Sequence, residues 1–398
     1  MGSEGWKKIR LAEFAKLVKK QYQPKIDEEL IYIGLEHIEQ QSLRINGTGN
    51  SKNVISQKYK FSNGDILFGK LRPYFRKVFR PKFDGVCSTD IWVVNAKNGF
   101  DQSFLFYFLA NQNFIDACNS GSSGTRMPRA DWDHLSETEW KIPPLSTQRR
   151  IVDILSALDD KIELNRQTNA TLEAIAQAIF KEWFVNFNFP GATGEMIESE
   201  LGPIPKGWRV GNLGEICKVV MGQSPPGDSY NEIGKGTPFF QGRSDFGFRF
   251  PTKRIFTTNP KRFAEKFNTL VSVRAPVGDM NIAIENCCIG RGLAAVIEIN
   301  GNSTYTFYFL KHLTENFRKF EDNGTVFGSI NKNDFEGMKC VIPTGEIISS
   351  FETGCRAIDD AIFNNYQQSS TLTKIRDVLL PKLMNREIDL DNGNNVVS

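Results

Sequence analysis

Two stretches of the chain carry mostly apolar residues at alternating steps of four and three, the spacing of a long helix that packs along one seam. The first passes through Ile151, Leu155, Leu158, Ile162, Asn165, Asn169, Leu172, Ala176, Ile179 and Trp183. The second passes through Phe351, Cys355, Ile358, Ile362, Asn365, Ser369, Leu372, Arg376, Leu379 and Leu383. We predict helices over 146–186 and 346–390, with a break near Pro381 because proline lacks the helical N–H donor.

Neither helix can bury its apolar seam alone, and the simplest partner for each is the other. We therefore predict an antiparallel pair with a domain at each end and an approximate two-fold axis. Asn165 and Asn365 would form a polar layer that fixes the register of the pair; alternatively, both face solvent. The predicted contact residues are Ile151, Leu155, Leu158, Ile162, Asn165, Leu172, Ile179, Ile358, Ile362, Asn365, Leu372 and Leu379.

The chain also repeats itself after about 200 residues, which indicates two copies of one unit. Gly5-Trp6-Lys7 returns as Gly207-Trp208-Arg209, Phe106-Tyr107-Phe108-Leu109 as Phe307-Tyr308-Phe309-Leu310, and Ile142-Pro143 as Ile342-Pro343. We expect an α+β protein with two similar α/β domains, 1–145 and 187–345, joined by the two helices and followed by a tail, 391–398. The residues between the repeated motifs differ, so the two domains can bind different things.

The charge is small overall, +3, but unevenly distributed. Nine basic residues stand between Lys52 and Lys82 against one acid, and nine between Lys235 and Arg274 against two. A basic segment in the corresponding part of each domain is typical of phosphate contacts. The predicted helices instead carry Asp153, Asp159, Asp160, Glu163, Glu173, Glu352, Asp359 and Asp360. A polyanion should avoid that surface, which suits protein partners.

Candidate DNA-binding residues lie in four segments. Gly69–Lys77 reads as a loop or strand end, where arginine can bind guanine and lysine or tyrosine can hold phosphate. A glycine-rich loop ends in two arginines near 126–129, and its counterpart keeps Gly324-Thr325 and a basic end. The predicted residues are Lys70, Arg72, Tyr74, Arg76, Lys77, Thr125, Arg126, Arg129, Arg243, Lys253, Arg254, Arg274, Thr325 and Lys332.

Composition argues against several other classes of protein. The seven cysteines are scattered without a CxxC motif, which favours reduced, mostly buried thiols over a disulfide framework or zinc site. The three histidines are not spaced as metal ligands. No apolar run approaches the roughly 20 residues that span a bilayer, and the start of the chain does not resemble a signal peptide. We expect a cytoplasmic protein that binds no metal.

These features resemble the specificity subunits of type I restriction–modification systems over nearly the whole chain. The most specific stretches are Tyr32–Ile38, Gly64–Tyr74 and Ile142–Gln148. The resemblance implies two target-recognition domains that read a bipartite site in double-stranded DNA, with spacer helices that bind two methyltransferase subunits. Restriction (motor and nuclease) subunits would join that complex. It implies no cofactor on this chain, and S-adenosylmethionine, ATP and Mg²⁺ on the partners. The second copy departs from the pattern, because Ile342–Glu346 lacks the Pro-Leu-x-x-Gln of the first.

Two other functions remain to be weighed. A nuclease needs clustered carboxylates around Mg²⁺, and the nearest approach is Glu139 and Lys141 with Asp131 or Asp133 upstream. The second copy has Lys339 in place of Glu139, which favours a plain strand edge. A scaffold with two peptide-binding domains would bind no DNA.

Overall fold

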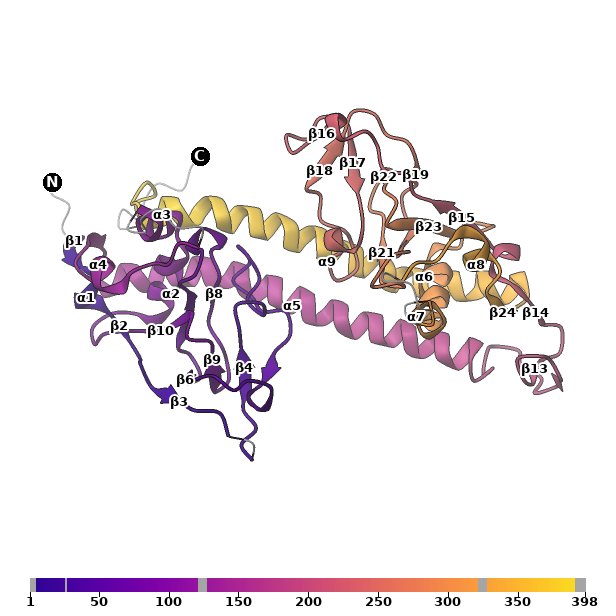
Figure 1. Ribbon diagram of the computed structural model, residues 1–398, viewed down its shortest axis with the longest axis horizontal. Helices are drawn as coiled ribbons and strands as arrows, with labels where there is room; N and C mark the ends of the chain where they lie inside the picture. Colours follow the sequence, from indigo (N-terminus) through magenta and orange to yellow (C-terminus); the bar gives the residue numbers. More distant parts are fainter. Residues whose placement is uncertain (1–4, 26, 121–126, 321–327, 391–398) are drawn as a thin grey trace. The chain divides into compact units, whose positions relative to one another are not determined.

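The computed structural model describes residues 5–25, 27–120, 127–320 and 328–390 (Figure 1). The chain divides into two compact units, which we call unit 1 (Met1–Asn165 with Gln367–Ser398) and unit 2 (Arg166–Tyr366). Each unit contains one domain of mixed helices and strands. Each also contains part of two long helices, α5 (Leu145–Phe184) and α9 (Gly345–Met384).

The two long helices follow the predicted seams, with one correction. The predicted break at Pro381 is wrong, because α9 continues past this residue to Met384. Pro381 lies in the last turn, where its missing N–H removes only one of the final hydrogen bonds, and its carbonyl still accepts one from Asn385 (2.9 Å). The helix therefore ends six residues short of the expected position 390.

Within each unit the α5 and α9 segments run antiparallel, as predicted. In unit 1, Asp159 contacts Arg376, and Asn165, further along α5, contacts Gln368, which is earlier in α9. In unit 2, Asn169 bonds the Ile362 carbonyl, while Phe180 packs against Phe351, with ring centroids 5.6 Å apart. In both units, residues with higher numbers on α5 contact residues with lower numbers on α9, as in an antiparallel pair.

The domain of unit 1 holds two larger sheets and a two-stranded ribbon, β1 (Lys7–Arg10) with β11 (Glu139–Ile142). A four-stranded sheet has the order β2 (Ala15–Leu17), β10 (Ile91–Ala96), β7 (Ile66–Gly69), β8 (Val78–Phe79). A five-stranded sheet has the order β3 (Gln21–Tyr22), β6 (Lys58–Phe61), β9 (Gly85–Cys87), β4 (Ile31–Ile33), β5 (Gly49–Asn50). The short helices are α1 (Leu11–Phe14), α2 (Gln102–Ala110), α3 (Gln112–Ser120) and α4 (Trp132–Ser136).

Unit 2 repeats this plan. Its ribbon is β14 (Arg209–Asn212) with β24 (Lys339–Ile342), and its four-stranded sheet is β15 (Cys217–Met221), β23 (Leu293–Glu298), β20 (Thr269–Ser272), β21 (Met280–Ile282). Its five-stranded sheet is β16 (Tyr230–Asn231), β18 (Ile255–Thr257), β17 (Thr237–Phe240), β22 (Cys287–Ile289), β19 (Phe263–Ala264). Helices α6 (Ser303–His312), α7 (Thr314–Arg318) and α8 (Lys332–Glu336) follow, and a hairpin, β12 (Met196–Ile197) with β13 (Ile204–Pro205), precedes the domain. The predicted internal repeat is thus a repeat of strand order in the ribbon, in the four-stranded sheet and in four strands of the larger sheet. The first strand of the larger sheet differs, because β3 pairs with β6 in unit 1 whereas β16 pairs with β18, at the opposite edge, in unit 2.

The core of each unit joins the domain to the long helices. Helix α2 is apolar on all sides and buried from Phe104 to Ala110, as expected for a helix enclosed by other elements. The Asp101 carboxylate caps it by accepting from the N–H groups of Ser103 and Phe104. This core extends to Leu155 on α5 and Leu383 on α9. In unit 2, Phe309 of α6 shares a core with Phe180 and Phe351. Each domain is therefore seated on its helix pair by apolar packing.

Two further sequence predictions concern the interior and the membrane. All seven cysteines are buried, unpaired thiols, as predicted. Burial raises the pKa of the Cys87 and Cys340 thiols to about 12. Among the described residues, the search for a helix long and apolar enough to cross a bilayer found none.

Candidate nucleic-acid interface

In unit 1 the structure brings two predicted DNA-binding segments together. Strand β7 ends at Gly69, and the loop that follows pairs with the segment before α4. The Arg72 N–H donates to the Pro128 carbonyl (2.8 Å), and the Ala130 N–H donates to the Lys70 carbonyl (2.9 Å). A β-bridge between Leu71 and Arg129 lies between these bonds. Lys70, Arg72 and Arg129, from two segments far apart in the chain, thus lie on one short strip of paired backbone.

The backbone around this strip is strained. Arg72 and Arg76 have φ values of 51° and 46° and flank a single 3₁₀ turn, Pro73–Phe75. Residues other than glycine adopt this left-handed backbone conformation at a cost of roughly 1–2 kcal/mol. Such strain concentrates at functional sites. Within the turn, Tyr74 is 45% exposed and its ring lies 4.6 Å from that of Phe75.

Two other predicted residues of this loop turn inward. The Arg76 side chain is only 14% exposed; its Nη2 donates to the Gln41 carbonyl (3.0 Å) and lies 3.5 Å from Asp377 Oδ1 on α9. Lys77 Nζ donates to the Leu35 carbonyl. Burial lowers the pKa of both side chains, with nearby carboxylates opposing the shift. DNA contact by these two residues stays a prediction, and their present partners are protein groups.

Unit 2 repeats the loop pairing. The Ala275 N–H donates to the Gly328 carbonyl (3.0 Å), the Ile330 N–H to the Val273 carbonyl (3.1 Å), and Arg274 forms a β-bridge with Ser329. Arg274 is exposed and occupies the position of Leu71, so the counterpart of Arg72 is the next residue, Ala275. Thr125, Arg126 and Thr325, which were also predicted to bind DNA, lie outside the described residues.

The other predicted residues of unit 2 are exposed and paired with acids. Arg243 contacts Asp279, in the loop that begins with Arg274. Arg254 Nη2 lies 3.3 Å from Asp245 Oδ1, and Lys253 contacts Glu285. Because an exposed ion pair is worth less than about 1 kcal/mol, Arg243 and Lys253 can exchange an acid for a phosphate at little cost. Asp245 is buried, so the Arg254 pair is more costly to break.

A hollow of about 560 Å³ along the edge strand β15 adds to this basic surface. Its lining includes Lys218 on β15, Arg262 before β19 and the predicted Lys332 at the start of α8. Lys332 Nζ is 3.3 Å from Glu336 Oε1. Sequence reasoning had missed Lys218, although Lys16 occupies the corresponding position on β2 in unit 1.

Two residues of the predicted basic segments need correction. Arg249 is 1% exposed and Lys58 is 4% exposed, so neither is part of a basic surface. Lys58 Nζ donates to the Ser56 carbonyl (2.8 Å). Arg249 is paired with carboxylates of both long helices. A count of charges along the chain cannot separate such buried cations from exposed ones.

The predicted helix contacts lie inside the protein. All twelve residues are buried or half-buried, and the alternative in which the asparagines face solvent is wrong. Asn165 Nδ2 donates to Gln368 Oε1 (2.8 Å) and Ser369 Oγ (3.2 Å), both on α9. Asn365 Nδ2 donates to Asn169 Oδ1 (2.9 Å). The role of these asparagines in fixing the register stays a prediction.

The view of the helix acids as a solvent-facing surface is only partly right. Tyr107 of α2 donates to Asp159 Oδ2 (2.7 Å), and Tyr308 of α6 donates to Asp359 Oδ1 (3.1 Å). Glu173 and Glu352 are buried. These acids attach each domain to a long helix. The sequence contained a signal of this role, because the tyrosine and the aspartate occupy matching positions in the two repeats. Arg376, the charged residue in the second seam, is 1% exposed and donates to Asp159 Oδ1 (2.7 Å).

The nuclease hypothesis loses its central residue. Glu139 stands on β11 and pairs with Lys8 on β1, whose hydrogen bond and charge lower the pKa of the Glu139 carboxyl. This is the strand edge that the sequence favoured. In the part of the chain that the structure describes, no group of three or more histidine, cysteine or acidic side chains is placed to hold a metal ion.

Known proteins share this architecture. The family model described as the type I restriction modification DNA specificity domain matches residues 3–174 and 205–353. A type I restriction enzyme MjaX specificity subunit of Methanocaldococcus jannaschii is 30% identical over 83% of this chain and 80% of its own length. The HindI specificity subunit of Haemophilus influenzae is 24% identical over 96% and 99%. The solved S subunit of a type I restriction-modification system from M. genitalium has a TM-score of 0.54 at 18% identity, over 96% of this chain and 97% of that one.

Proposed function

Because the chain belongs to the type I restriction–modification DNA specificity family, we propose that it reads a bipartite target in double-stranded DNA with one domain per half-site. The chain is a non-catalytic recognition subunit. The observation that supports two separate readers is the repeated loop pairing, which presents Arg72 in unit 1 and Arg274 in unit 2. The residues around each arginine differ, so each domain has its own half-site.

Recognition combines two kinds of contact. We propose that Arg72 and Arg274, at the paired loops, meet base edges, where arginine binds guanine O6 and N7 with two hydrogen bonds. Lys70, Arg129 and the cations of the β15 hollow hold phosphates, which position the domain without reading sequence. Phosphate contacts make affinity fall steeply as salt rises.

The test uses the full chain and a randomised duplex library from which bound sequences are recovered. We expect the wild type to select two conserved blocks. Arg72→Ala should blur one block and Arg274→Ala the other, each lowering discrimination there by about tenfold or more. Lys8→Ala, an exposed cation on β1, is the matched control. Equal loss in both blocks from either variant would refute separate readers, and salt-insensitive binding would favour a peptide-binding scaffold.

For partners, we propose that methyltransferase subunits dock on the outer faces of the long helices. In unit 1, Leu164 on α5 and Ile375 and Val378 on α9 are 54%, 42% and 55% exposed, which is unusual for branched apolar residues on otherwise polar faces. Changing Val378 and Leu164 to aspartate should abolish capture of the cognate methyltransferase subunit while DNA selection remains. Unchanged capture would exclude this face.

The cofactors of methylation and cleavage would be bound by the partner subunits. A methyltransferase pair would bring S-adenosylmethionine, and restriction subunits would bring the ATP and Mg²⁺ that translocation and cleavage require. We propose two methyltransferase subunits because there are two recognition units. We propose that the chain acts in the cytoplasm, where it meets the DNA that it reads.

A further inference from the structure

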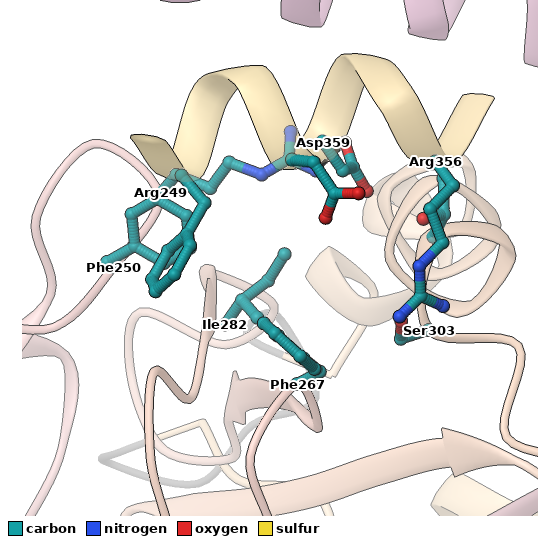
Figure 2. Close-up of a pocket in the computed structure, with 10 residues that line it drawn as sticks. Arg249, Phe250, Phe267, Ile282, Ser303, Arg356 and Asp359 are labelled. Carbon is teal, nitrogen blue, oxygen red and sulfur yellow. Dashed lines mark hydrogen bonds and ion pairs between the residues drawn. The ribbon is translucent and has the colours of Figure 1, made fainter. Parts of the chain in front are cut away.

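A buried cluster of charges ties the domain of unit 2 to both long helices. Arg249, at the tip of a tight loop closed by a bridge between Phe246 and Pro251, reaches a carboxylate on each helix. Its Nη1 lies 3.4 Å from Glu173 Oε2 on α5, and its Nη2 donates to Asp359 Oδ1 on α9. Figure 2 shows Arg249 beside Asp359 at the helix.

The surroundings of Arg249 show that this cluster is a junction and no ligand site. Nη1 also donates to the Tyr308 hydroxyl (2.9 Å), and the guanidinium lies 4.2 Å from the centre of the Phe307 ring. Lys311 Nζ contacts Glu173. The adjoining cavity, lined by Phe250, Phe267 and their neighbours in Figure 2, has a volume of about 30 Å³. That is room for about one water molecule.

The loop that carries Arg249 also carries candidate DNA contacts. Arg243 lies six residues before it and Arg254 five residues after it. The loop is stiff: Asn281 exchanges two hydrogen bonds of 3.0 Å with the Gly247 backbone, and the Ile282 N–H donates to the Arg249 carbonyl (2.8 Å). A shift of Arg249 relative to the helices would therefore move the exposed arginines at the base of the loop.

Unit 1 contains an equivalent tie in a different loop. Arg76 leaves the loop that presents Arg72, four residues away, and its Nη2 lies 3.5 Å from Asp377 Oδ1 on α9. Asp377 also accepts from Arg376 Nη2 (3.0 Å), and Arg376 bonds Asp159 on α5. Both long helices are again linked, through one line of ion pairs, to a loop with a candidate recognition arginine.

We propose that Arg76 and Arg249 are positioning residues for sequence recognition. Each guanidinium fixes a DNA-facing loop of its own unit to carboxylates on the long helices. In unit 1 this holds Arg72 at the angle that fits the base edges. In unit 2 it holds Arg243, which contacts Asp279 in the loop that begins with Arg274 and so holds that recognition arginine in turn. Neither residue touches DNA in this role. The inference rests on the proposed function, and it assigns Arg76 a different task from the direct DNA contact that the sequence suggested.

The test in unit 1 compares Arg76→Met with Asp377→Asn in the full chain. Asparagine keeps an oxygen that can accept from Arg376 but removes the charge that holds Arg76. Duplexes selected by the wild type, and single-base variants in each half, are titrated at several salt concentrations. The half-site of unit 1 is the one weakened by Arg72→Ala. Thermal unfolding of each variant checks that the fold is kept.

A positioning role predicts that both substitutions lower discrimination at the half-site of unit 1 by about tenfold and leave the other half unchanged. The double variant should lose no more than either single one, because both act through one contact. The slope of log Kd against log salt should stay as in the wild type. A direct phosphate contact would give another result: Arg76→Met would lower that slope by about one, and Asp377→Asn would bind as well as wild type or better.

Unit 2 offers an independent test with small changes. Tyr308→Phe removes only the hydroxyl between Arg249 and Asp359, and Arg249→Lys keeps the charge but loses the forked contact with two carboxylates. Both should lower discrimination at the half-site of unit 2 alone. Wild-type discrimination in these variants and in Asp377→Asn would overturn the inference while leaving the proposed function standing. Absence of selective DNA binding by the wild type would instead overturn the proposed function.

Discussion

The stability of unit 2 should depend on Arg249 to an extent that the structure allows us to estimate. Arg249→Met removes the cation between Glu173 and Asp359, whose side chains are 7% and 16% exposed. Breaking a buried ion pair by removing one partner costs about 3–5 kcal/mol, because a carboxylate is left buried and uncompensated. Lys311 still contacts Glu173 and Tyr308 still donates to Asp359, so we expect the lower end, about 3 kcal/mol.

Differential scanning calorimetry of the full chain measures this loss. For a unit of about 200 residues, about 3 kcal/mol corresponds to a fall in Tm of roughly 6–12 °C. The triple variant Arg249→Met, Glu173→Gln, Asp359→Asn should recover most of it, because no buried charge then remains without a partner. A loss below about 1 kcal/mol in the single variant, or a triple variant less stable than the single one, would refute the view that charge compensation at this cluster stabilises the unit.

Three other outcomes can be checked separately. Arg72→Gly should leave the free energy of unfolding unchanged or raise it by up to about 1 kcal/mol, since glycine accepts φ = 51° without strain. The same variant should lose half-site discrimination. A destabilised variant in urea titrations would contradict this. Phe351→Ala removes a fully buried ring that packs against Phe180, Phe184 and Tyr305. It should lower the free energy of unfolding by about 3–5 kcal/mol in the same titration, and a loss below about 1 kcal/mol would count against this core. The seven buried thiols should react with Ellman's reagent only after denaturation, because burial raises the pKa of Cys87 and Cys340 to about 12; rapid reaction of the native protein would show that the interior opens readily.

Much of the fold could be deduced from two patterns in the chain. The heptad seam located α5 to within one or two residues of its observed bounds, Leu145–Phe184. The repeat led to two domains that share the strand order of the ribbon, of the four-stranded sheet and of four of the five strands in the larger sheet. Both patterns are periodic, and many residues contribute to each, so single exceptions such as Pro381 do little damage. The internal repeat also pointed to the loops that carry Arg72 and Arg274.

The site was harder to deduce because the use of a charge depends on what surrounds it. Arg249 and Arg243 look alike in the sequence, yet one is 1% exposed and the other is largely exposed. Arg76 and Arg72 are four residues apart, and the 3₁₀ turn between them sends one toward Asp377. Pairing of Arg376 with Asp159 joins residues far apart in the chain, and no local pattern signals it.

The division of the chain between the units has a consequence for its synthesis. Unit 2 is one continuous segment, Arg166–Tyr366, whereas unit 1 needs Gln367 and the residues after it, including Leu380 and Leu383 in its core. Domains generally fold as units while the chain leaves the ribosome, the first-made segment first. Here the order is reversed: the half made first must wait, with the α5 side of its core uncovered, until the last turns of α9 emerge. A ribosome that stops before Leu380 would therefore release a chain with a finished second reader and an unfinished first one.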